Sequence, residues 1–158
     1  ELFDAACEEH PSSVALLIPG SGNLPAREMK YAELASAVEE LASMLNSVGV
    51  TVGGVVALIL HRSVAQVIAT YGVLKSGAAF LPVDADAPTS RKQFLLAESD
   101  ATAVLGIQGD AEVADLAKDS GACHIALRVD GLAGGLTLTN PALTRWSFTG
   151  TRPASFTS

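Results

Sequence analysis

The chain has 158 residues, of which 49% are hydrophobic and 17% are charged, so it can fill one core and wholesale disorder is excluded. Its formal net charge is -7 and no basic cluster is longer than Arg91-Lys92, which disfavours a nucleic-acid partner. No apolar run approaches the roughly 18 residues that span a bilayer, so we expect no membrane partner.

The first third of the sequence predicts a short helix, a hairpin and a long amphipathic helix. Apolar residues at helical spacing indicate a helix over 2–9, and strands are expected over 14–18 and 28–30. The next helix is predicted over 31–48 because apolar residues step along it by four, three, four and three. This stripe consists of Leu34, Val38, Leu41, Leu45 and Val48.

A buried strand and an unusually apolar helix follow. The run over 55–60 has no polar alternation, which is typical of a parallel strand buried on both faces. Ser63 and Gln66 have the spacing of a capping box, so a helix is predicted over 64–76, with Gly77 as a left-handed cap. This helix is apolar on nearly every side, and we expect it to pack on more than one side.

The remaining elements continue the alternation of strands and helices. Pro82 places the strand over 79–83 at a sheet edge or at a strand end. Pro88 is expected to open a helix that ends near Glu98, with Phe94, Leu95 and Ala97 as inward contacts. A strand over 102–107, a helix over 110–120 and a strand over 124–129 complete the pattern. The sequence therefore predicts an α/β fold with a mainly parallel sheet flanked by helices.

Residues 1–130 are predicted to form one lobe, and residues 131–158 are predicted to form an irregular loop or tail. The second segment is rich in Gly, Thr, Ser and Pro and shows no periodicity. Cys7 and Cys123 are too few and too far apart for a disulfide framework. We expect two reduced, partly buried thiols and a cytoplasmic location. The sequence begins at Glu1 without Met or a secretory signal, which suggests an excised or truncated piece.

Four ordered motifs carry a resemblance to a known family. The segment from Leu74 to Asp84 resembles the Leu-Lys-Ala-Gly-x-Ala-Tyr-x-Pro-Leu-Asp core motif of adenylation domains. Tyr31-Ala32-Glu33-Leu34 resembles the start of a helix in that family, and Gly53 to Arg62 resembles one of its strands. Further matching positions are Pro88, Arg91, Phe94, Leu96, Ser99 and Ala101. The chain is thus similar to the N-terminal fragment of a nonribosomal peptide synthetase adenylation domain, a member of the adenylate-forming enzymes.

The resemblance implies activation of a carboxylic acid, often an amino acid, by ATP with Mg²⁺. The acyl-adenylate is then passed to the thiol of a carrier protein. The matched motifs are mostly architectural in this family, and they imply an incomplete N-terminal lobe whose partners are the rest of the adenylation domain and the carrier. The family's adenine-facing motif, its ribose-binding motif and its catalytic lysine come later and are absent here. We therefore expect no catalytic residue in this chain and no cofactor bound by it alone.

One segment resembles a degenerate form of the family's phosphate loop. The family pattern is Tyr-Thr-Ser-Gly-x-Thr-Gly-x-Pro-Lys-Gly, and the only candidate here includes Thr149, Gly150, Thr151 and Arg152. Ala154 stands where the family has Lys. A phosphate cradle needs consecutive accessible N–H groups and a cation, so one glycine and one arginine are a poor set. An irregular tail is the favoured interpretation, and a degenerate phosphate loop is the alternative.

Other polar residues have ordinary structural interpretations. His61-Arg62 follows a strand and precedes a helix, where α/β sheets bind ligands, but a solvent-facing loop is favoured. Asp84 and Asp86 could be paired carboxylates, although turn and helix-start roles are favoured. His10 and His124 lack a second ligand at metal spacing, so no metal site is expected.

Lys30 departs from the family pattern, which has Thr or Ser before the matching Tyr31. Lysine cannot accept an N–H bond at a helix start, and its charge opposes the helix dipole.

Two alternative functions remain open from the residues. One is a stand-alone interaction module or pseudoenzyme that retains only the lobe. The other is a small nucleotide-binding α/β domain, which the absence of a Gly-x-Gly-x-x-Gly motif disfavours.

Overall fold

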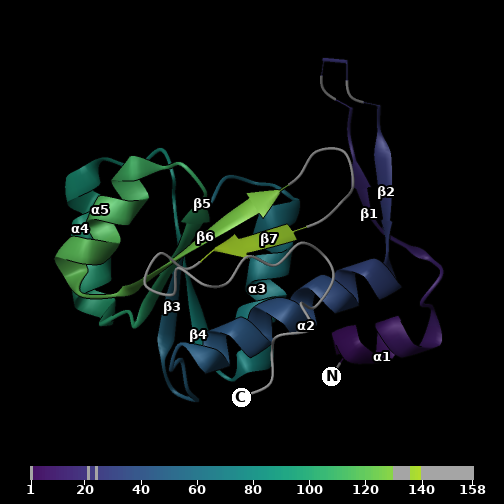
Figure 1. The fold of residues 1–158 in the computed structure, drawn as a ribbon, viewed down its shortest axis with the longest axis horizontal. Helices are drawn as coiled ribbons and strands as arrows, with labels where there is room; N and C mark the ends of the chain where they lie inside the picture. The colour runs from purple at the N-terminus through teal and green to yellow at the C-terminus, as the bar shows by residue number, and fades with distance from the viewer. Residues whose placement is uncertain (1, 21, 24, 130–135, 140–158) are drawn as a thin grey trace.

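The computed structural model describes residues 2–20, 22–23, 25–129 and 136–139 (Figure 1). In chain order its elements are α1 (Leu2–Glu9), β1 (Val14–Ile18), β2 (Arg27–Lys30), α2 (Tyr31–Ser47), β3 (Val55–Ile59), α3 (Val64–Ser76), β4 (Ala79–Val83), α4 (Thr89–Ser99), β5 (Ala103–Ile107), α5 (Ala111–Ser120), β6 (Cys123–Val129) and β7 (Leu136–Thr139).

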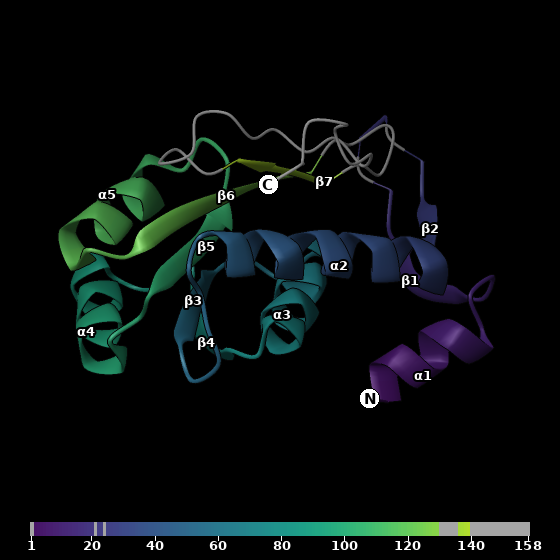
Figure 2. The ribbon, with the colours of Figure 1, turned by 60° about the horizontal axis from the view of Figure 1, so that its bottom comes forward.

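The main sheet has five strands in the order β4-β3-β5-β6-β7, and β1 and β2 form a separate antiparallel hairpin. Strands β4, β3, β5 and β6 are parallel, and β7 is antiparallel to β6. Helices α2 and α3 lie on one face of this sheet, and α4 and α5 lie on the other (Figure 2). The predicted α/β fold with a mainly parallel sheet is confirmed. β4 lies at an edge, as Pro82 predicted, because an edge strand can do without one ladder donor.

The sheet divides the hydrophobic core into two clusters. Val56 and Leu58 on β3 pack in the cluster with α2 and α3, and Ala57 and Ile59 pack in the cluster with α4 and α5. All four side chains are buried. The prediction that this strand is buried on both faces is therefore confirmed.

Helix α3 packs between α2 and the sheet, as its apolar surface predicted. A Cβ atom on Gly72 would lie 2.6 Å from Cδ2 of Leu41, so the two helices approach each other through a glycine. The start of α3 is capped by Ser63 Oγ, which accepts the N–H of Gln66 at 3.3 Å. Gly77 adopts the left-handed conformation with φ of +92°, which confirms the predicted cap.

The predicted inward face of α4 is wrong at two positions. Phe94 is 53% exposed and Ala97 is exposed, whereas Lys92 and Leu96 are buried. Lys92 and Leu96 are four residues apart and therefore share one face of the helix. The exposed ring of Phe94 instead lies 5.5 Å below the Arg91 guanidinium.

Strand β7 corrects the expectation that residues 131–158 contain no regular structure. Its four residues, Leu-Thr-Leu-Thr, alternate apolar and polar types, and they pair with β6 in a register that joins Ala126 to Thr139. The alternation is too short to stand out in a Gly-rich and Thr-rich segment, and pairing with β6 decides the outcome.

A buried lysine joins α4 to α5. The ammonium of Lys92 is 3.0 Å from Oε2 of Glu112, and the hydroxyl of Thr89 donates to Oε1 of the same carboxylate at 2.6 Å. The side chain of Lys92 is 2% exposed, whereas that of Glu112 is 40% exposed. The hydrogen bonds from Thr89 and Lys92 lower the pKa of Glu112. The carboxylate therefore serves as the counter-charge that allows a lysine to be buried.

Helix α2 begins with half of a capping arrangement. The N–H of Lys30 donates to Oε2 of Glu33 at 2.8 Å, and the Lys30 side chain makes no cap hydrogen bond. An ammonium group carries no lone pair, so it cannot accept the N–H of Glu33 in return.

We predict that Glu112→Ala destabilises the chain more than Lys92→Met. The first change leaves a buried ammonium without its acceptor, whereas the second leaves a carboxylate that water can reach. Urea unfolding of both variants measures the difference in the free energy of unfolding. Because the pKa of Glu112 is lowered in the folded state, its contribution is present above its ordinary pKa and is lost as the pH falls through the folded value. A larger loss from Lys92→Met, or a Glu112→Ala effect that persists in acid, would contradict this account.

We predict that Lys30→Thr raises the free energy of unfolding by about 0.5–2 kcal/mol, because the hydroxyl supplies the missing acceptor at the helix start. Urea melts of the variant and of the parent chain measure the gain. Adding Glu33→Ala should reverse part of it, since the reciprocal bond to the Lys30 N–H is then lost. No gain, or a loss, on Lys30→Thr would show that the side chain of Lys30 stabilises this helix start in another way.

Candidate functional site

The predicted phosphate loop, Thr149 to Arg152, lies outside the described residues. Its assignment therefore stays a prediction.

The described part of the chain has a topological switch point between β3 and β5. Helix α3, which follows β3, lies on one face of the sheet, and helix α5, which follows β5, lies on the other face (Figure 2). In open α/β sheets, ligands bind in the crevice outside the carboxyl ends of strands at such a point. The residues that follow these two strand ends are therefore the first candidates for a site.

His61 and Arg62 follow β3 and are exposed, which confirms the predicted solvent-facing loop. Nδ1 of His61 is 3.7 Å from Oδ2 of Asp86, and the two side chains are 69% and 81% exposed. This separation exceeds a hydrogen bond, and water reaches both groups, so the pair is not a preorganised acid and base.

Asp84 has the turn role that the sequence favoured. Its Oδ1 accepts the N–H of Asp86 at 2.9 Å, and its carbonyl accepts the N–H of Ala87 at 3.1 Å. The Asp84 carboxylate therefore shapes the turn between β4 and α4.

At the carboxyl ends of β3 and β5, the helices that follow begin with side-chain caps from the chain itself. The N-terminus of α3 is capped by Ser63, and that of α5 is capped by Asp110, whose Oδ1 accepts the N–H of Val113 at 3.3 Å. At each of these two helix starts, one of the N–H groups that could bind a phosphate therefore already has a side-chain acceptor. Asp110 also adds negative charge after β5, and Asp84 and Asp86 add it after β4.

His124 on β6 is partly buried, and among the described residues its Nε2 atom has no hydrogen-bond partner. Burial lowers its pKa, and the charge of Asp110 acts in the opposite direction. The described ranges contain no group of three or more His, Cys, Asp or Glu residues that could hold a metal ion.

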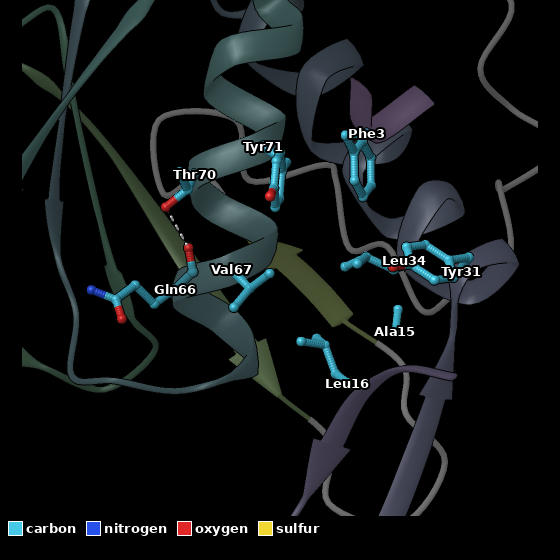
Figure 3. A pocket seen from close by; sticks show the side chains of 9 residues that line it. All are labelled: Phe3, Ala15, Leu16, Tyr31, Leu34, Gln66, Val67, Thr70 and Tyr71. Carbon is cyan, nitrogen blue, oxygen red and sulfur yellow. Dashed lines mark hydrogen bonds between the residues drawn. The ribbon is translucent and has the colours of Figure 1, made fainter. Parts of the chain in front are cut away.

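A cavity of about 400 Å³, which no sequence pattern predicted, lies where α1, β1, α2 and α3 meet. Figure 3 shows that its walls come from all four elements: Phe3, Leu16, Tyr31, Leu34, Val67 and Tyr71 surround a mostly apolar space. We call this space the α1 cavity. Its lining residues come from four separate parts of the sequence between Phe3 and Tyr71, so only the fold brings them together. The lining contains no acid, base or nucleophile at catalytic spacing.

Comparison with known proteins identifies relatives over most of the chain. The family described as AMP-binding enzyme matches residues 3–151. The chain is 37% identical over 105 residues to tyrocidine synthase 2 of Brevibacillus parabrevis, which covers 66% of this chain and 3% of that protein. It is 31% identical over 146 residues to the nonribosomal peptide synthetase sidC of Arthroderma benhamiae, which covers 90% of this chain and 3% of that protein.

The fold is similar to that of MatB from Rhodopseudomonas palustris. The apo form superimposes with a TM-score of 0.66 at 21% identity, over 84% of this chain and 26% of the other. The form with ATP bound superimposes with a TM-score of 0.64 at 20% identity over the same shares of the two chains. The chain therefore spans about a quarter of this neighbour and a small part of the curated relatives.

None of the helices within the described ranges is both long enough and apolar enough to cross a membrane. The family match extends over far more than half of the sequence and includes all the parallel strands of the main sheet. The chain belongs to the family of AMP-binding enzymes.

Proposed function

We propose that this chain is the N-terminal lobe of an adenylation domain that activates an amino acid with ATP for transfer to a carrier thiol. The observation that carries the proposal is the match to the AMP-binding enzyme family over residues 3–151. The similarity to nonribosomal peptide synthetases supports an amino acid as the substrate and a carrier protein as the acceptor. In this proposal residues 1–130 are the lobe, and the reaction takes place in the cytoplasm.

The chain alone does not catalyse the reaction in this proposal. Its described residues place capped helix ends and carboxylates at the switch point, where a triphosphate would need free N–H groups and cations. ATP and Mg²⁺ would bind to the complete domain, and the ATP-bound form of MatB supports the use of ATP. The partners of this lobe are then the rest of the adenylation domain and the carrier protein.

We predict that the isolated chain does not exchange pyrophosphate into ATP with any amino acid or aryl acid. Preorganised groups that stabilise charge in the transition state commonly contribute a factor of about 10²–10³ each, and the described residues supply none. A radiolabelled exchange assay against a blank without protein measures this directly. Exchange above the blank would contradict the non-catalytic part of the proposal.

The family part of the proposal has its own test. A chimera in which residues 2–129 replace the matching segment of a tyrocidine synthase 2 adenylation domain should retain amino-acid-dependent exchange, because the segment supplies the same lobe. The matched control is the parent domain, and circular dichroism establishes that the chimera is folded. A folded chimera that has no exchange would contradict the assignment of this lobe.

We predict that ATP binds the isolated chain with a dissociation constant in the range of about 1 mM or weaker, since few phosphate contacts remain. Calorimetry measures the affinity of the parent chain and of Arg152→Ala. Micromolar binding that is abolished by Arg152→Ala would instead establish Thr149, Gly150, Thr151 and Arg152 as a working phosphate loop.

A further inference from the structure

Helix α1 is weakly stabilised by its own sequence. It has eight residues, whereas isolated helices shorter than about 12–15 residues are marginal in water. Glu8 and Glu9 lie at its C-terminal end, where negative charge opposes the helix dipole. None of its residues is buried, and Leu2 is 92% exposed. The helix therefore depends on its contacts with the rest of the chain.

Two side-chain contacts with α3 secure α1. The rings of Phe3 and Tyr71 stack with centroids 4.3 Å apart and planes 14° from parallel (Figure 3). The ammonium of Lys75 is 3.0 Å from Oδ1 of Asp4 on α1 and 2.6 Å from Oε1 of Glu39 on α2. Lys75 thus joins three helices, and the carboxylates of Glu39 and Asp4 raise its pKa, so it stays charged at neutral pH.

The segment that follows α1 is fixed independently of it. The N–H of Tyr31 donates to the carbonyl of Ser13, and the N–H of Ala32 donates to the carbonyl of Pro11, both at 3.0 Å. These bonds attach residues 11–13 to the start of α2. These two hydrogen bonds between residues 11–13 and the start of α2 do not involve α1.

Apolar space lies beneath α1. The α1 cavity of about 400 Å³ shares Phe3, Tyr31 and Tyr71 with a second cavity of about 880 Å³ that also reaches Leu74 and Lys75. Departure of α1 removes Phe3 from both cavities and opens the apolar surface of Leu34 and Val67 to solvent.

We propose that α1 is a strap: it can detach from the lobe and unfold, while residues 11–13 stay bound to the start of α2. The ion pairs of Lys75 with Asp4 and Glu39 are the latch that holds the strap closed. The three charged side chains of the latch are 33%, 43% and 58% exposed, so dissolved salt screens their attraction. Rising ionic strength therefore favours the open strap. This inference is independent of the proposed ligase function.

Cys7 on α1 reports the opening, and Cys123 on β6 is the internal control. Both thiols are half-buried. The rate at which an uncharged maleimide labels each thiol is measured by mass spectrometry in the full 158-residue chain. Lys75→Met removes the latch charge and keeps an apolar stem. Lys118→Met is the matched control, because Lys118 also lies in the last turn of its helix.

We expect Lys75→Met to speed the labelling of Cys7 by about two- to tenfold, since exposed ion pairs contribute a few tenths to one kilocalorie per mole each. Lys118→Met should leave the rate unchanged, and neither variant should change the rate at Cys123. Burial raises the pKa of the Cys7 thiol and the Lys75 charge lowers it, so loss of that charge alone would slow labelling. A faster labelling rate at Cys7 in Lys75→Met therefore reports detachment of α1.

Salt provides a second test that needs no variant. Raising the ionic strength from about 0.01 M to about 1 M shortens the Debye length from about 30 Å to about 3 Å. Labelling of Cys7 should accelerate, while labelling of Cys123 should not. The proposal is overturned if both thiols respond equally, which indicates global unfolding, or if Lys75→Met labels no faster than Lys118→Met.

Discussion

The close approach of α3 to α2 at Gly72 is the contact on which one side of this structure depends. A side chain at this position would overlap Leu41, which is itself fully buried. Helix α3 connects β3 to β4, and these two strands pair in parallel. Helix α2 packs against α3. Helix α1 contacts α3 through Tyr71 and Lys75. A side chain that displaced α3 at this contact would therefore also displace α2 and α1.

The other face of the sheet combines a similar steric fit with an electrostatic one. Gly106 on β5 lets Val113 of α5 approach so closely that a Cβ atom would lie 2.6 Å from it. Helix α4 is then joined to α5 by the buried ammonium of Lys92 and the carboxylate of Glu112. A charge buried with its partner contributes little net stability, but it penalises arrangements in which the two helices are misplaced. Both faces thus combine a close steric fit with an ion pair between helices, which is Lys75 with Glu39 on one face and Lys92 with Glu112 on the other.

The sequence was sufficient for the fold because its signals were strong and consistent. Continuous apolar runs marked the strands, and the caps at Ser63 and Gly77 set the ends of α3, whose observed bounds match the predicted ones. The face of α4 was predicted wrongly because the partner of Lys92 is 20 positions away and comes from another helix. The α1 cavity was missed for the same reason, since tertiary contacts alone assemble it. The assignment to a family came from recognised motifs, and the candidate phosphate loop remains a prediction from sequence.

The order of strands in the main sheet has a consequence for how the chain folds during synthesis. β3 is made first, β4 then pairs with one of its edges, and β5 pairs with the other. β6 adds to β5 and β7 adds to β6, so each new strand joins an edge that is still open. No strand has to be inserted between two that are already paired. Since a ribosome delivers about 5–20 residues per second and domains fold from the N-terminal side, the lobe can assemble strand by strand as it emerges.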